Sequence, residues 1–184
     1  MVAICLFTAK GFANDDDDDK KWGFYDKGGY SSLKWDTDGG GSTDLRGVHF
    51  EAGAVYNIQK NVPLMFGLAF KDYSKSEYKV KTRADILEVP VTAGYDFKIN
   101  EKIGVIVHAG PYLDYVVNGY TKYDGEKFKF KDDDDFKEFG VGAKVGAIIH
   151  IYGFDIIGEY GYNFTERAKD TKESYWTIGV GFAF

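Results

Sequence analysis

The chain has 184 residues, enough for one ordinary domain, and its 23 Lys and Arg against 29 Asp and Glu give a net charge of −6. This acidic balance argues against nucleic acid as a partner, because duplex binding requires a basic face. The single cysteine, Cys5, excludes an internal disulfide and a multi-cysteine zinc site. The abundance of glycine, tyrosine and phenylalanine is typical of a β-protein. No apolar run reaches the roughly 18 residues of a transmembrane helix, whereas a transmembrane β-barrel needs only alternating apolar residues.

Residues 1–13 resemble the apolar segment and cleavage site of a secretory signal peptide. Gly11-Phe12-Ala13 matches the small-x-small rule, which predicts cleavage after Ala13. No basic segment precedes the apolar run, so we expect a truncated signal; an N-terminal strand or an apolar tail is the alternative. Residues 14–21 read NDDDDDKK, and repulsion among the aspartates predicts a disordered acidic leader. The remainder, 22–184, is expected to form one domain.

Eight candidate strands and no convincing helix follow the leader. The strands are expected at about 22–35, 45–59, 62–74, 84–99, 102–118, 136–152, 154–166 and 174–184. Short connections alternate along the chain with long polar ones. The long connections are expected at 36–44, 74–83, 119–135 and 167–173. This alternation predicts an up-and-down meander with all tight turns at one end and all long loops at the other.

Side chains alternate between the two faces of a strand, and in most candidate strands one face is apolar. In the last strand the apolar face carries Trp176, Ile178, Val180, Phe182 and Phe184. The opposite faces carry mainly glycine with isolated charges. Only the first candidate strand, interrupted by the sequence DKGG, gives no clean assignment of faces.

Two barrel architectures share this pattern, and the less apolar face decides between them. A soluble barrel such as a lipocalin places the apolar face inside, and a membrane barrel inverts this arrangement. A water-facing surface would be rich in Lys, Glu, Thr and Ser. Glycines such as Gly140, Gly142 and Gly146 instead fit the crowded interior of a small tube. The sequence therefore predicts an all-β, eight-stranded antiparallel up-and-down transmembrane β-barrel.

The isolated charges then fall inside the barrel, where pairing must offset their desolvation. We expect a structural interior polar network of Glu51, Lys71, Glu88, Asp96, His108, Glu138, Lys144, His150 and Glu159. His49 shares this face with His108 and His150, but a metal trio would require all three at one height, which the sequence does not show. We therefore expect single hydrogen-bonded interior histidines, with no metal and no cofactor.

No catalytic or cation-binding motif stands out. Few serines lie in the candidate strands and the spacing shows no Ser/His pair, so we expect no enzyme. The four carboxylates of Asp132–Asp135 could attract Ca²⁺, but they lack the alternation and glycine turn of a calcium loop. We expect a solvated charge run there.

The C-terminal segment resembles the terminal strand of outer-membrane proteins, with a final Phe184 and apolar residues at alternate positions. In that class this segment is read by the barrel-insertion machinery, a signal the resemblance assigns to Trp176, Ile178, Val180, Phe182 and Phe184. Two further segments, 87–97 (LEVPVTAGYDF) and 108–115 (HAGPYLDY), resemble the PorT-like outer-membrane β-barrel family of small eight-stranded bacterial proteins. The resemblance covers about residues 45–184.

This resemblance implies export through the periplasm to a bacterial outer membrane, with membrane lipid and the insertion machinery as partners. It does not assign a function. We expect a filled interior and a structural or surface-binding role, or an accessory role in secretion or envelope assembly, with a protein partner bound through the long loops. A narrow channel for ions or small solutes and a lipid-modifying barrel enzyme are the alternatives.

Overall fold

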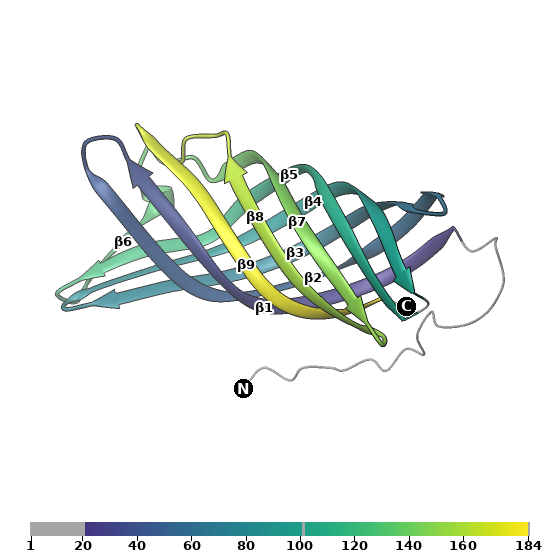
Figure 1. Ribbon diagram of the computed structural model, residues 1–184. Helices are drawn as coiled ribbons and strands as arrows, with labels where there is room; N and C mark the ends of the chain where they lie inside the picture. Colours follow the sequence, from purple (N-terminus) through teal and green to yellow (C-terminus); the bar gives the residue numbers. More distant parts are fainter. Residues whose placement is uncertain (1–20, 101, 184) are drawn as a thin grey trace.

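The computed structural model describes residues 21–100 and 102–183, and within them eight long strands form a closed antiparallel barrel (Figure 1). The strands of the barrel wall are β1 (Trp22–Thr37), β2 (Gly41–Gln59), β3 (Val62–Glu77), β4 (Val80–Asn100), β5 (Ile103–Tyr123), β7 (Phe139–Ile151), β8 (Phe154–Asn163) and β9 (Thr171–Ala183). Each strand pairs with its neighbours in this order, and β1 pairs with β9 to close the ring. The predicted all-β up-and-down barrel is confirmed. Among the described residues, no helix is long and apolar enough to cross a membrane.

The two ends of the barrel differ. At one end, called the short-turn end, tight connections join β2 to β3 and β7 to β8, and β1 begins beside the end of β9. At the other, called the hairpin end (Figure 1), β1 to β5 and β9 extend beyond their expected boundaries, whereas β7 begins later and β8 ends earlier than expected. The predicted signal at 1–13, nearly all of the acidic leader at 14–21, and Phe184 lie outside the described residues.

Most of the expected long loops are wrong, because the strands continue through them. Only Asp38–Gly40 separates β1 from β2, and only Tyr78 and Lys79 separate β3 from β4. Within 119–135, β5 runs on to Tyr123 and a short strand β6 (Glu126–Lys129) pairs with it before a 3₁₀ turn, η1 (Phe130–Asp132). Irregular loops remain at 133–138, between η1 and β7, and in the connection between β8 and β9.

The barrel wall places its apolar face outward. Ile178 on β9 is 59% exposed, whereas Lys144 on β7 is 3% exposed. Aromatic residues such as Trp22 and Phe154 near the short-turn end and Phe70 and Tyr115 nearer the hairpin end lie on the outer surface. This arrangement is the inversion expected of a membrane barrel.

Side chains fill the interior in layers. Near the short-turn end, Tyr25 and Met65 belong to an apolar cluster that Ile148 and Ile157 complete. Toward the hairpin end lies a larger apolar layer, made of Leu33, Leu45, Tyr73, Ile86, Tyr112, Val116 and Tyr175. Between them lies a belt of charge: on β1, Lys27 lies between Tyr25 and Leu33. Glycine makes room for the large rings, since any side chain at Gly161 would overlap the ring of Tyr175.

Candidate functional site

The belt of charge forms the main candidate site and is called the lumen cluster. Six strands contribute one buried charge each, in the order β1, β2, β3, β4, β7 and β8, and the sign alternates around the ring. The members are Lys27, Glu51, Lys71, Glu88, Lys144 and Glu159. Three ammonium groups thus face three carboxylates, and all six side chains are nearly inaccessible to solvent.

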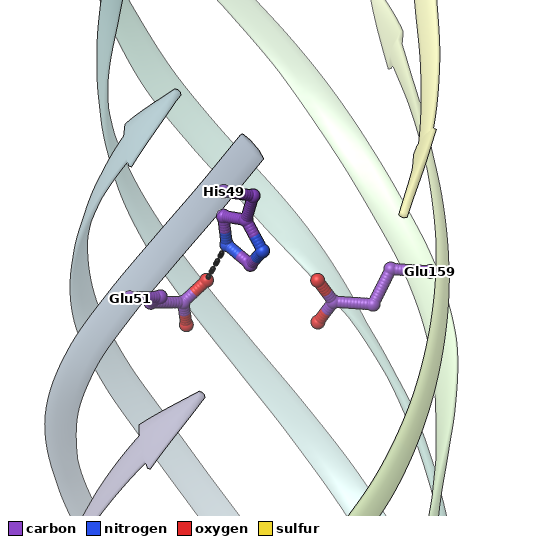
Figure 2. Close-up of side chains that lie close together, drawn as sticks. All are labelled: His49, Glu51 and Glu159. Atoms are coloured by element: carbon purple, nitrogen blue, oxygen red, sulfur yellow. Dashed lines mark ion pairs between the residues drawn. The ribbon is translucent and has the colours of Figure 1, made fainter. Parts of the chain in front are cut away.

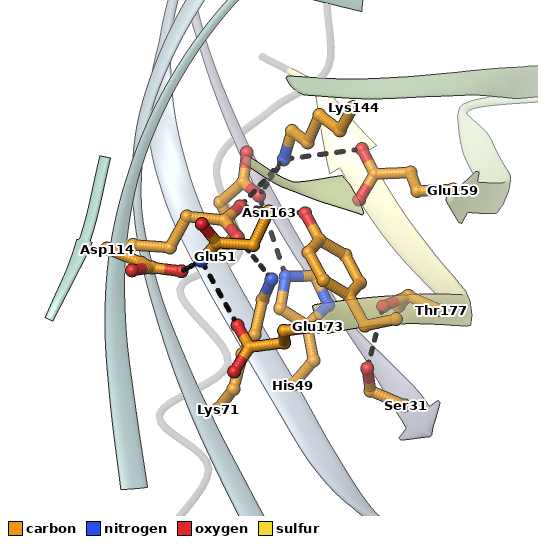
Figure 3. A network of polar contacts seen from close by, with 12 residues as sticks. Ser31, His49, Glu51, Lys71, Asp114, Lys144, Glu159, Asn163, Glu173 and Thr177 are labelled. Atoms are coloured by element: carbon orange, nitrogen blue, oxygen red, sulfur yellow. Dashed lines mark hydrogen bonds and ion pairs between the residues drawn. The ribbon is translucent and has the colours of Figure 1, made fainter. Parts of the chain in front are cut away.

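Lys144 bridges all three glutamates of the lumen cluster (Figure 3). Its Nζ lies 3.0 Å from Glu51 Oε2, 3.3 Å from Glu88 Oε1 and 3.7 Å from Glu159 Oε1. Lys27 Nζ joins two of the same residues, at 2.6 Å from Glu159 Oε1 and 3.1 Å from Glu51 Oε1. Lys71 donates to Glu88. Because each glutamate contacts at least one ammonium, no carboxylate of the cluster is left uncompensated in a region of low dielectric.

Tyrosine side chains connect the lumen cluster to the apolar layers on either side. The Tyr25 hydroxyl donates to Glu51 Oε1 at 2.6 Å, and the Tyr175 hydroxyl donates to Glu88 Oε1 at 3.2 Å. Lys71 Nζ also lies 3.3 Å from the centroid of the Tyr175 ring, a cation–π contact. The polar and apolar layers therefore form one packed interior.

A second polar group, called the mouth cluster, lies nearer the hairpin end around Arg167 of the β8–β9 loop. The buried guanidinium contacts Asp114 Oδ1 at 2.5 Å and Glu173 Oε2 at 2.9 Å. Asn163 donates to Asp114 Oδ2 at 2.9 Å, and Trp35 Nε1 donates to Glu173 Oε2 at 2.7 Å. Although burial acts to lower it, the two carboxylates raise the pKa of Arg167 above its usual value. The loop is thus tied into the barrel by a charged anchor.

Three residues of the interior could in principle hold a metal ion (Figure 2). The ligand atoms of His49, Glu51 and Glu159 all lie within 4.8 Å of one another, and His49 Nε2 is 3.5 Å from Glu51 Oε2. Both carboxylates, however, already contact Lys27 and Lys144. A divalent cation would have to displace an ammonium from a balanced cluster, so the arrangement favours ion pairs over metal binding.

Two of the three histidines, His49 and His108, differ from the expectation that each is hydrogen-bonded. The ring nitrogens of His49 and His108 are buried and form no hydrogen bond with any described residue, although His108 Nε2 lies 3.4 Å from Glu159 Oε1. His150 lies far from both, near the short-turn end, where its Nδ1 is 2.7 Å from Asp155 Oδ1. The three histidines therefore do not form a common site.

The structure brings most residues of the expected interior network together, but not all. Glu51, Lys71, Glu88, Lys144 and Glu159 form the lumen cluster, with His108 at its edge. Asp96 and His150 are half-buried near the short-turn end, away from the cluster.

The placement of Glu138 inside the barrel was wrong. Glu138 precedes the first residue of β7, so the alternation of faces along that strand does not apply to it. Its side chain accepts a hydrogen bond from the outward-facing Tyr115 hydroxyl at 2.8 Å.

Sequence reasoning missed three important charges. Lys27 lies in the DKGG segment that gave no clean pattern, yet it pairs directly with Glu51 across β1 and β2. Glu173 lies on the same side of β9 as Tyr175 and Thr177, so extending that face by one step would have found it. Arg167 lies in a polar loop, and no sequence periodicity indicates that a loop side chain enters the barrel.

The comparisons with known proteins agree with this geometry. A family model described as "Outer membrane protein beta-barrel domain" matches residues 2–184. The chain belongs to this family. No curated protein matches its sequence.

Among solved structures, Neisserial surface protein A is 17% identical, with a TM-score of 0.58 over 88% of this chain and 97% of that chain. Ail, the attachment invasion locus protein of Yersinia pestis, is 19% identical, with a TM-score of 0.52 over 89% of this chain and 99% of that chain. These likenesses show the fold. The family places the chain in the outer membrane.

The expected insertion signal lies on the outer face of β9. Trp176, Ile178, Val180 and Phe182 are all exposed there, in the position of lipid-facing residues. Their role in barrel insertion stays a prediction.

Proposed function

We propose that this outer-membrane barrel is a structural, partner-binding protein that acts at the bacterial surface through its hairpin end. The observation that carries the proposal is the filled interior. The lumen cluster and the apolar layer above it occupy the tube with buried side chains, which leaves the outer surfaces as the sites of interaction. The names of the two structural neighbours describe a surface protein and an attachment protein, the same kind of role.

The hairpin end supports this role because its paired strands present exposed side chains. The β3–β4 hairpin and the β5–β6 hairpin continue as paired strands beyond Phe70 and Tyr115, the aromatic residues of the barrel wall described above. Aromatic side chains such as Tyr78, Tyr123 and Phe128 are well exposed on these hairpins. Paired strands hold such side chains in fixed positions, which lowers the entropy lost when a partner binds.

Site-specific photo-crosslinking in native membranes tests the proposal. A photoreactive residue replaces Phe128 on β6 or Tyr78 at the β3–β4 turn, and Val145 on the lipid-facing side of β7 serves as the control position. We expect one and the same protein adduct from both hairpins, competed by the purified barrel, and none from Val145. Deleting residues 124–136, which include position 128, should abolish the adduct from position 78 while heat-modifiable gel mobility is retained. Absence of protein adducts from both hairpins would overturn the proposal.

A second candidate is the PorT-like role of an accessory in secretion or envelope assembly. It rests on the sequence resemblance at 87–97 and 108–115. Here the contact surface would be the short-turn end, where Tyr152 is 67% exposed. A reproducible adduct from position 152 to an envelope protein would support this candidate, and a barrel that purifies alone with no such adduct would count against it. Nothing in the described residues favours the lipid-modifying enzyme.

A further inference from the structure

The outer surface at the hairpin end carries an unusual row of like charges. In the register of the sheet, Lys81 on β4 is directly opposite Lys122 on β5, which is directly opposite Lys127 on β6. Lys129 lies two residues further along β6, on the same face, and is opposite Tyr120. These four lysines are called the lysine face, and all four are exposed. Like charges placed directly opposite across strands are destabilising, so the row carries an energetic cost.

Neighbouring acids do not relieve this cost. Asp124 pairs with Lys79 at 3.0 Å, and Asp72 and Asp85 both pair with Arg83 at 3.0 Å. Among the described residues, no carboxylate forms an ion pair with any lysine of the lysine face. Lys127 instead lies over the Tyr120 ring, with Nζ 4.1 Å from the centroid. The acidic run Asp132–Asp135 begins at the last residue of η1 and is exposed, and it forms no ion pair with these lysines either.

The lysine face points sideways over the membrane, because it shares its side of the wall with the lipid-facing residues. On β4 the outward positions run from Lys81 through Arg83 and Asp85 to Leu87 and then to further apolar residues. Tyr73 and Ala84, paired across β3 and β4, are fully buried on the inward side, which fixes this parity. The lysines therefore stand directly above the apolar band.

Their height indicates the kind of headgroup they meet. Lys81 is six positions beyond Leu87, and a strand rises about 3.3 Å per residue, so a tilted strand lifts it about 15 Å above the apolar band. The headgroup layer of a simple bilayer is only about 5–8 Å thick on each side. Long lysine side chains can reach down several ångströms, but anions carried on a taller, saccharide headgroup match the level better.

We propose that the lysine face binds the phosphate groups of saccharide-headed lipids in the leaflet at the hairpin end of the barrel. Bound phosphates neutralise the opposed lysines, which removes the repulsion across β4, β5 and β6. The inference is separate from the partner-binding role, because it concerns the side of the barrel rather than its tip, and either can hold without the other.

The test compares two variants of equal charge. K81Q/K122Q/K127Q removes three charges from the lysine face. K34Q/K169Q/K172Q removes three exposed charges from the other side of the hairpin end, where Lys34 pairs with Asp36 at 3.3 Å and Lys172 with Asp38 at 3.8 Å. Heat-modifiable gel mobility verifies that both variants fold.

Binding is measured in detergent solution by the fluorescence anisotropy of labelled rough lipopolysaccharide with a phosphorylated core. We expect the control variant to match the wild type and the lysine-face variant to bind about a hundredfold more weakly, at about fivefold for each lysine near an anionic surface. Dephosphorylated lipopolysaccharide should bind all three proteins weakly. Phosphatidylglycerol and free inorganic phosphate should compete poorly.

Four results would overturn the proposal. One is equal binding by the lysine-face variant and the wild type, and another is undiminished binding of the dephosphorylated lipid. Equal competition by phosphatidylglycerol would show that saccharide height plays no part. Tighter binding of a soluble heparin oligosaccharide than of the lipid would assign the lysine face to an extracellular glycan instead.

Discussion

The buried lysines of the barrel each lie among glutamates from other strands, so their charges are compensated within the wall. Lys144 touches Glu51, Glu88 and Glu159, and Lys27 touches two of the same three. Such pairs add little net stability compared with apolar packing, because desolvation offsets the attraction. Breaking one is different, since it leaves a charge buried without a partner.

Replacing Lys144 with methionine should therefore be severely destabilising. We expect the free energy of unfolding to fall by about 3–5 kcal/mol at neutral pH, measured by urea titration in lipid vesicles with tryptophan fluorescence. The loss should shrink at acidic pH, because a proton then neutralises the excess carboxylate. The exposed Lys34→Met, which removes a surface pair with Asp36, should cost less than about 1 kcal/mol. Equal losses in the two variants would refute the buried-pair account.

Gly161 and Gly158 offer a matched test of interior packing on a single strand, β8. A side chain at Gly161 would overlap the Tyr175 ring, whereas one at Gly158 would meet open space on the outer surface. Gly161→Val should cost about 1–3 kcal/mol through overpacking, and Gly158→Val should be tolerated. Urea midpoints of the two variants measure the difference, and a tolerated Gly161→Val would show that the interior is loosely filled.

At the scale of elements, tight turns fix the register of the hairpins. Tyr152 and Gly153 join β7 to β8, with φ of 52° and 87°, a conformation that favours the sharp two-residue turn of a hairpin. Gly153→Ala should cost about 1–2 kcal/mol, because a Cβ clashes with the backbone in the left-handed region. Tyr152→Asn should be neutral or stabilising in the same urea titration. The turn argument fails if Gly153→Ala has no effect.

The sequence predicted the lipid-facing parts of the strands well and their outer ends poorly. The alternation that identified β9, from Trp176 to Phe182, exists because one face meets lipid and the other a packed interior. Beyond the membrane both faces of a strand meet water, so the segment SKSE at 74–77 shows no alternation although it is part of β3. The same reason explains why 119–123 at the end of β5 was expected to be a loop.

The sequence predicts which face of the barrel wall a residue occupies, but not its position along the barrel axis. Alternation placed Glu51, Glu88 and Glu159 inside correctly, but their meeting depends on the stagger between strands, which alternation does not contain. The same limit applies to His150, which lies on the same strand as Lys144 but near the short-turn end of the barrel. Arg167 required knowledge of how a loop folds back, and no local pattern carries that information.

For the whole molecule, the layered interior predicts a closed tube. The lumen cluster and the apolar layer around Tyr112 and Tyr175 lie in series along the axis. Planar-bilayer recordings of the purified barrel should therefore show no unitary current steps at moderate voltage. Leu33→Ala, which shortens one side chain of the apolar layer, should stay silent because the lumen cluster remains. Regular steps from the wild type would favour the narrow-channel alternative.

The alternating signs around the lumen cluster also bear on how the barrel finds its correct closure. A one-residue slip between strands would turn apolar side chains inward and polar side chains toward lipid, which is energetically unfavourable. A two-residue slip preserves inside and outside, so the bilayer alone cannot detect that error. It would, however, move Lys27 by about 7 Å relative to Glu51 and so break the ion pair between them inside the barrel. Ion pairing in the lumen cluster should therefore disfavour misregistered barrels that hydrophobicity alone would accept.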